Sequence, residues 1–385
     1  MNKDRKIRVL ILAQMIALSM AAVSIPALIT TFQKEYNLTI AQSAIIPIIS
    51  TIGGFITNII IASVSARMGL KRLNLYFLFI GLSACTILAF SSNIYLFLVG
   101  ITLIGISTAF GLTNTSTIFA HIDLKYQNYG VFHAFFGVGG IIAPAIVSFL
   151  LKHNFSYRYI YYLLMVLFLS FIGFVATSKL IENKKYDNIK LKEAFSILRK
   201  SFILPVLIII VLQAGSEQGI VIWSGNLFDD VLGYSTQSAS LFLSFYWIVF
   251  TASRLLMQFV EKPLGKLNTV KLSIAFVVIF LALLLLTDLP VFFILLATVM
   301  APVFPLMQKY SAQKLPPREV GLFNGMVFAF TSIGNVIIAG SMGGLGDYNL
   351  KLSYLIPIFG ALIILAILFH LSSLKRSGKV EVSPK

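Results

Sequence analysis

One glutamate, Glu217, lies deep inside a long apolar run, and of the 14 acidic residues it is the one that falls well within such a run. A charged side chain at the centre of a bilayer costs roughly 2.5–3.5 kcal/mol on insertion scales, so a carboxylate there needs a reason. Gly215 and Gly219 flank it, and glycines let neighbouring backbone pack closely. These residues therefore indicate a site rather than an accident of composition.

Three roles for Glu217 are open from the sequence. It could be a structural acid, held protonated and hydrogen-bonded to a neighbouring helix. It could accept hydrogen bonds from the hydroxyl groups of a substrate, or it could bind and release a coupling proton, and these two roles are compatible. An ionisable residue inside a membrane is functional by default, and a facilitator of neutral solutes needs no carboxylate. We therefore expect Glu217 to be the proton-coupling residue.

Amide and indole side chains in the other apolar runs suggest the ligand. Amides both donate and accept hydrogen bonds, and beside aromatic faces they suit a neutral, polyhydroxylated solute. An amide inside a membrane is also a common contact between helices, so each one has this second interpretation. The residues expected to bind substrate are Gln14, Asn114, Gln213, Gln218, Trp223, Trp247, Gln308, Asn324 and Asn335.

The composition sets the class of protein that must position these groups. Of 385 residues, 58% are hydrophobic and 11% are charged, whereas soluble proteins carry about 25% charged residues. The chain is therefore expected to be a polytopic membrane protein. Its net charge of +16 comes from basic residues in short loops, which indicates membrane topology and not nucleic-acid binding. We find no metal-ligand spacing, nucleotide-binding glycine loop or nucleophile motif, so we expect no enzyme, catalytic residue, metal or cofactor.

Twelve apolar runs are long enough to span a bilayer, which needs about 20 residues each. Of the 30 lysines and arginines, Lys34, Lys152, Arg158 and Lys351 fall on one predicted face and the rest on the other, so both termini are expected in the cytoplasm. The predicted spans are 8–30, 41–64, 73–91, 95–118, 131–151, 158–178, 202–225, 237–259, 270–287, 290–310, 320–342 and 350–373.

The chain divides at its middle. We expect a six-helix half over 1–178, a cytoplasmic linker over 179–201, and a second half with a short basic tail over 202–385. The linker contains "NIKLKEAFSILRKSF", whose apolar residues recur at helical spacing and predict an amphipathic helix on the inner leaflet. "FFGVGGIIAPAIVSFL" from Phe135 and "FTSIGNVIIAGSMGGL" from Phe330 resemble one another at the offset that a duplication would give.

The stretch "SARMGLKRL" resembles the signature loop of the major facilitator superfamily. Arg67, Gly69, Lys71 and Arg72 match that pattern, whereas Ala66 stands where the family has aspartate. The resemblance implies the twelve-helix fold of that superfamily and a cytoplasmic gate at this loop. "SRLLMQFVEKPLGKL", which contains Arg254, is its counterpart in the second half.

Three further stretches resemble the fucose–galactose–glucose:proton symporter branch of the superfamily. They are "VFHAFFGVGGIIAPAI", "AGSEQGIVIW" and "SFYWIVFTASRLL", in the order and spacing of that branch. The fucose member of that branch uses carboxylates in its first and fourth spans, whereas the first and fourth spans here carry none. The resemblance therefore implies a sugar as the substrate, and proton coupling does not carry over with it.

We therefore expect an all-α integral membrane protein that acts as a secondary active transporter of a small neutral solute, with a sugar as the first candidate. The mechanism would be proton-coupled alternating access. The alternative is a proton-driven exporter of drugs or metabolites on the same scaffold. The expected partners are the solute, protons and the lipid bilayer, with no nucleic acid, in a monomer. The expected location is the inner membrane of a bacterium.

Overall fold

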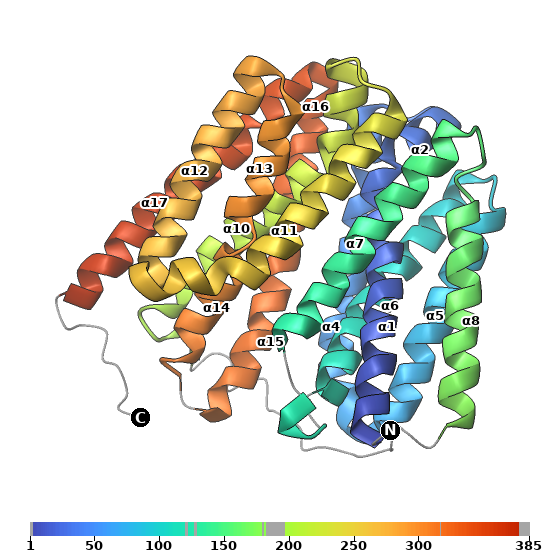
Figure 1. Cartoon of the computed structure of the whole chain (residues 1–385), viewed down its shortest axis with the longest axis horizontal. Helices are drawn as coiled ribbons and strands as arrows, with labels where there is room; N and C mark the ends of the chain where they lie inside the picture. Colours follow the sequence, from blue (N-terminus) through green and yellow to red (C-terminus); the bar gives the residue numbers. More distant parts are fainter. Residues whose placement is uncertain are drawn as a thin grey trace. The chain divides into compact units, whose positions relative to one another are not determined.

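The computed structural model describes residues 3–119, 122–126, 129–178, 181, 197–315 and 317–376, and every regular element in these ranges is helical (Figure 1). The elements are α1 (Lys3–Ala27), α2 (Ile29–Tyr36), α3 (Ile40–Ser43), α4 (Ile45–Met68), α5 (Leu70–Phe90), α6 (Ile94–Phe119), η1 (Leu124–Tyr126), α7 (Tyr129–Lys152), α8 (Tyr159–Thr177), α10 (Ile203–Asn226), η2 (Leu227–Val231), α11 (Thr236–Leu264), α12 (Lys266–Thr287), α13 (Pro290–Met300), α14 (Val303–Ala312), α15 (Pro317–Gly334), η3 (Asn335–Ala339), α16 (Gly340–Ser353) and α17 (Leu355–Arg376).

Within the described ranges, 12 helices are long and apolar enough to cross a membrane. This number confirms the predicted fold class and the even count of spans. Several spans consist of more than one element, because short breaks divide the tenth into α13 and α14 and the eleventh into α15, η3 and α16. The predicted amphipathic helix lies mostly outside the described residues.

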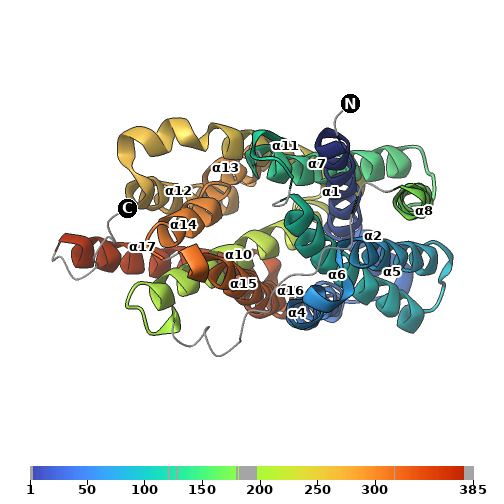
Figure 2. The ribbon, with the colours of Figure 1, turned by 90° about the horizontal axis from the view of Figure 1, so that it is seen from below.

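The chain forms two compact units. Unit 1 contains Met1–Asn188 and Ser224–Ile248, and unit 2 contains Ile189–Trp223 and Val249–Lys385. Helices α10 and α11 therefore each contribute residues to both units. In unit 1, α1 packs against α6, α7 and α8, and α5 packs against α6 and α8. Figure 2 shows α8 nearly end-on beside α5. In unit 2, α12 packs against α13, α14 and α17.

A glycine makes one close helix contact in each unit, at equivalent positions of the predicted repeat. A Cβ on Gly139 would lie 2.3 Å from the carbonyl oxygen of Ile16, and a Cβ on Gly334 would lie 2.1 Å from that of Val211. Gly139 and Gly334 are 195 positions apart, and so are Ile16 and Val211. The same backbone contact therefore occurs twice, which supports the duplication that the two sequence stretches suggested.

The two predicted signature loops also share one backbone conformation. Gly69 joins α4 to α5 with φ +81° and ψ 146°, and Gly265 joins α11 to α12 with φ +75° and ψ 157°. This region of φ and ψ is almost confined to glycine. A glycine is therefore required at both turns, whatever the surrounding charges do.

Candidate functional site

Glu217 lies on α10 in unit 2, more than halfway along the helix, and its side chain is partly exposed. The amide of Gln213, one turn earlier on the same helix, and the guanidinium of Arg254 on α11 both interact with its carboxylate. The structure thus gives the intramembrane acid a neutral donor and a cation. Arg254 was predicted for the cytoplasmic gate, and the structure places it in this cluster.

A break in the tenth span explains how Arg254 and Gln213 are held. Helix α13 ends at Met300 and α14 begins at Val303. Residue 305 is proline, which has no N–H, so the carbonyl of Ala301 has no helical donor four residues later. Arg254 Nε donates to the oxygen of Ala301 at 3.4 Å, and Gln213 Nε2 donates to that of Met300 at 3.4 Å.

Two consecutive carbonyl groups therefore anchor the two side chains that interact with Glu217. The guanidinium of Arg254 also lies over the ring of Phe250, with Cζ 4.4 Å from its centroid, which stabilises a cation in an apolar setting. Broken helices whose backbone groups serve a site near the middle of the membrane are typical of transporters. This arrangement was not predicted, although Pro302 and Pro305 within an apolar run were its signal in the sequence.

The glycines beside Glu217 act as contact points between helices. A Cβ on Gly215 would lie 2.3 Å from the carbonyl oxygen of Gly334, and one on Gly219 would lie 2.4 Å from Sδ of Met342. Helix α10 is thus held directly against α15 and α16. This contact fixes the helix on which Glu217 sits.

Two of the predicted substrate residues bind backbone in the same region. Trp223 is fully buried and donates from Nε1 to the carbonyl oxygen of Ala339 at 2.8 Å. Asn335, with its amide oriented so that the nitrogen donates, reaches the carbonyl oxygens of Ala214 at 3.1 Å and Thr331 at 3.2 Å. Asn335 and Ala339 are the first and last residues of the π-helix η3. Both side chains therefore fasten this π-helix to its surroundings.

Two further predicted residues, Gln14 and Asn114, form a buried chain of amides in unit 1. Gln14 and Asn74 exchange hydrogen bonds of 3.0 and 3.2 Å, Asn74 Nδ2 donates to Asn114 Oδ1 at 3.0 Å, and Asn114 Nδ2 donates to the oxygen of Leu70 at 3.3 Å. All three amides are at most 2% exposed. They join α1, α5 and α6, and Asn74, a lone amide in an apolar run, was not among the predicted residues.

The remaining predicted residues are scattered. Gln218 and Gln308 are partly exposed, on α10 and α14. Trp247 packs on α7, where a Cβ on Gly140 would lie 2.8 Å from its indole. The side chain of Asn324 lies outside the described part of the chain. An apolar hollow of about 530 Å³ between α4, α5 and α6 is lined mainly by isoleucines, and none of the predicted substrate residues lines it.

The comparisons with known proteins agree with this architecture. The family model described as Major Facilitator Superfamily matches residues 10–339. The chain belongs to the major facilitator superfamily. It is a membrane transporter and not an enzyme, as the sequence predicted. No curated protein sequence matches it.

Solved structures of other transporters share the fold of this facilitator. The nucleoside transporter NupG is 16% identical, with a TM-score of 0.72 over 98% of this chain and 100% of its own. A bacterial homologue of the human lysosomal transporter Spinster is 12% identical, with a TM-score of 0.77 over 100% and 99% of the two chains. The peptide transporter POT, in complex with sulfate, is 12% identical, with a TM-score of 0.76 over 98% and 96%.

The signature loop of this facilitator contacts its own unit. Lys71 Nζ donates to the carbonyl oxygens of Ala176 at 3.1 Å and Ser178 at 2.7 Å. These groups lie at the end of α8, where a cation is favourable because the helix dipole is negative there. Arg72 is exposed, and the side chain of Arg67 lies outside the described part of the chain. Lys71 is thus a helix cap in this conformation.

Proposed function

We propose that the chain is a secondary active transporter of a small neutral solute, with a sugar as the substrate class, and that it works by proton-coupled alternating access. The observation that carries the proposal is the cluster of Glu217, Gln213 and Arg254 at the broken tenth span. It combines one group that can gain or lose a proton with one fixed positive charge.

Glu217 and Arg254 provide the chemistry of coupling. The deprotonated carboxylate is stabilised by the guanidinium, which remains charged at any physiological pH. Protonation of Glu217 removes that attraction and frees the guanidinium, so the two protonation states favour different arrangements of α10 and α11. An equilibrium between conformations shifts only by such a difference in interaction free energy. Arg254 thus becomes the charge partner of the coupling residue.

The solute class is supported by the sequence and by the polarity of the site. The carboxylate of Glu217 accepts hydrogen bonds, and Gln213 and Gln218 on the same helix both donate and accept them, which suits hydroxyl groups. The stretches around Glu217 and Arg254 resemble those of the fucose–galactose–glucose:proton symporter branch. NupG is a nucleoside transporter and POT is a peptide transporter, so the fold also serves other hydrophilic solutes.

The topology of the proposal follows the charges. Both termini and the loop with Arg67, Gly69, Lys71 and Arg72 are assigned to the cytoplasm, and the protein to the inner membrane of a bacterium, as a monomer. Residues 1–178 and 202–385 are the two halves that move, joined by the linker at 179–201. The alternation of basic loops supports this orientation.

Transport into proteoliposomes tests the proposal. A panel of labelled hexoses is offered with and without an inward proton gradient to the wild type, to Glu217→Gln and to Arg254→Gln, with Asp288→Asn in a loop as the matched control. We expect gradient-driven accumulation to disappear in Glu217→Gln while exchange of the solute persists. We expect Arg254→Gln to shift the pH at which transport is half-maximal, and Asp288→Asn to behave as wild type.

Three outcomes would contradict parts of the proposal. Accumulation by Glu217→Gln equal to wild type makes Glu217 a structural acid. Loss of both accumulation and exchange, with normal folding, makes it a substrate ligand without a separate coupling role. Expulsion of a cationic dye in the absence of any sugar flux establishes the exporter instead.

A further inference from the structure

Helices α1 and α2 meet α10 and α11 through small side chains within unit 1. Ser240 Oγ donates to the carbonyl oxygen of Ala27 at 3.0 Å, and a Cβ on Gly225 would lie 3.2 Å from Cγ2 of Ile29. A narrow gap between these helices is lined by Pro26, Ala27, Thr30, Ser224, Gly225, Thr236, Ala239, Ser240 and Leu243. Small residues allow such close approach, and the helices leave no room for a solute at this end.

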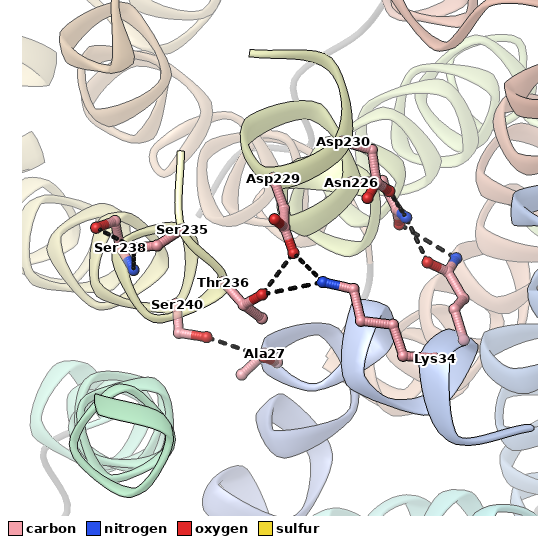
Figure 3. Close-up of polar contacts among 10 residues, drawn as sticks. Ala27, Lys34, Asn226, Asp229, Asp230, Ser235, Thr236, Ser238 and Ser240 are labelled. Carbon is pink, nitrogen blue, oxygen red and sulfur yellow. Dashed lines mark hydrogen bonds and ion pairs between the residues drawn. The ribbon is translucent and has the colours of Figure 1, made fainter. Parts of the chain in front are cut away.

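An ionic contact covers the rim of this junction (Figure 3). Lys34 Nζ lies 2.9 Å from Asp229 Oδ2 and donates to Thr236 Oγ1 at 3.3 Å, and Thr236 Oγ1 donates to the same carboxylate oxygen at 2.5 Å. The side chain of Lys34 is 63% exposed, whereas that of Asp229 is 15% exposed. Solvent therefore screens the lysine, and the contact is easily broken.

A buried chain of amides lies beside the ionic contact. Asn226 Nδ2 donates to Gln33 Oε1 at 2.5 Å and to Asp230 Oδ2 at 2.6 Å, and Gln33 Nε2 donates to Ser43 Oγ at 2.6 Å. Gln33 is 8% exposed and Asn226 is fully buried. These groups have no water to replace a lost partner, so separating them costs more than separating the exposed ion pair.

The π-helix η2 and the short helix α2 place these groups. In η2 the consecutive carboxylates of Asp229 and Asp230 turn to different partners, one to the ionic contact and the other to the amide chain. Neighbouring residues of α2 also bind different parts of the chain. Gln33 and Lys34 bind the segment 224–248, and the next residue, Glu35, does not.

Glu35 fastens α2 to the first part of the chain. Its Oε1 lies 2.6 Å from Arg158 Nη2, its other oxygen accepts from the hydroxyl of Tyr157, and Arg158 also donates to the carbonyl oxygen of Ser91 at 2.8 Å. The ring of Tyr36 lies 4.7 Å from that of Phe97. Helix α2 is thus bound firmly on one side, so a separation must occur at Gln33 and Lys34.

We propose that these contacts form the gate that closes the outer entrance of the transport path, with Lys34–Asp229 as its exposed latch and Gln33–Asn226–Asp230 as its buried seal. The inference rests on the proposed alternating access. Helices α1 and α2 lie in the first of the two halves proposed to move, 1–178, and α10 and α11 lie in the second, 202–385. A rocking motion of the two halves therefore separates the ends of α10 and α11 from α1 and α2. The gate must then open, and the free energy needed to break its latch and its seal sets the fraction of molecules in which it is open.

The labelling rate of a single thiol at the junction tests the gate. Cys85 is the only cysteine of the sequence and is buried, so labelling in the variant Thr30→Cys comes from the introduced cysteine. The side chain of Thr30 is 2% exposed in this conformation, so a cysteine there becomes accessible when the junction opens. A membrane-impermeant maleimide is added to sealed vesicles of each orientation in separate samples, so that one face of the protein is exposed to the reagent at a time. The variants are Lys34→Met, Asn226→Leu and the exchange Lys34→Asp with Asp229→Lys. Lys351→Met is the matched control, because Lys351 and Asp288 form an ion pair of 2.5 Å within unit 2.

We expect labelling from the side away from the N-terminus. Lys34→Met should raise its rate about twofold to fivefold, as loss of an exposed ion pair does, and Asn226→Leu should raise it about tenfold or more, since buried partners lose their hydrogen bonds. The charge exchange should return the rate towards wild type, and Lys351→Met should leave it unchanged. Unchanged rates in Lys34→Met and Asn226→Leu would overturn the gate, as would an equal rise in Lys351→Met.

The assay needs no substrate, so it separates this inference from the proposed function. Faster labelling in the gate variants, together with no sugar or proton flux in proteoliposomes, retains the gate and rejects the proposed sugar symport. Normal symport with labelling that no gate variant changes rejects the gate alone.

Discussion

The repeated glycine contact predicts a loss of stability at two equivalent positions. A real Cβ is essentially never closer than 3.0 Å to such an atom, so Gly334→Ala must move α15 away from Val211, whose oxygen would otherwise lie 2.1 Å from the new methyl group. A shift of about 0.9 Å between packed helices is comparable to overpacking a core, which costs about 1–3 kcal/mol. Gly139→Ala must shift by about 0.7 Å against Ile16, where the distance is 2.3 Å, and should cost somewhat less.

Thermal unfolding of the purified protein in detergent measures this cost. Cys85 is buried, so a thiol-reactive fluorogenic dye reacts when the helices around it unfold. The midpoint Tm should fall by about 2–4 °C for each kcal/mol lost, given halves of 150–250 residues. Gly173→Ala is the control, because a Cβ at Gly173 meets nothing within 4 Å and alanine favours a helix.

The comparison of the three variants decides the matter. If Gly334→Ala and Gly139→Ala are as stable as Gly173→Ala, the helices are not held in backbone contact and the repeat has no structural meaning at these positions. If only one of the two loses stability, the contact is real in one half and the equivalence fails.

Three other substitutions test contacts in unit 1, in unit 2 and at a loop. Asn74→Ala leaves the amides of Gln14 and Asn114 without their shared partner, so the free energy of unfolding should fall by about 1–3 kcal/mol in the same dye assay. Trp223→Phe keeps an aromatic ring but removes the hydrogen bond to Ala339 and part of a fully buried indole, so it should cost more than the about 0.5–1.5 kcal/mol of the hydrogen bond alone, measured likewise. Burial, and then the hydrogen bond to Glu35, raise the pKa of the Tyr157 hydroxyl above its usual value of 10, so the folded protein holds this proton more tightly than the unfolded chain. Stability should therefore fall as the pH rises above about 10, and Tyr157→Phe should make a plot of Tm against pH less steep there.

The fold was largely predictable because its causes are local. Apolar runs of sufficient length predict membrane helices, and the glycine turns at Gly69 and Gly265 follow from residues that tolerate a positive φ. The breaks inside spans were less accessible. The break at Ala301 is caused by prolines within a run that is apolar throughout. Hydropathy alone therefore predicts one continuous helix there.

The acid of the candidate site is easier to find from the sequence than the residues that interact with it. Glu217 stands out because its charge is costly in a membrane, a property of one residue. Its interaction with Arg254 depends on how two helices and a third, broken one pack together, which no single stretch of sequence contains. The amides show that the residue type alone does not give the partner. Gln14 and Asn114 have side chains that suit a ligand, and in the structure they hydrogen-bond Asn74.

The glycine contacts also bear on how much sequence such a fold can lose. A contact between a glycine and a carbonyl group requires only that no side chain be present on one of the two helices, and it leaves the identity of nearly every other residue unspecified. Two chains can therefore share this fold at low sequence identity, and this chain and NupG are 16% identical with a TM-score of 0.72. The same reasoning applies to the proposed repeat within the chain, where Gly139 and Gly334 stand in register but Ala22 is at the position that corresponds to Glu217.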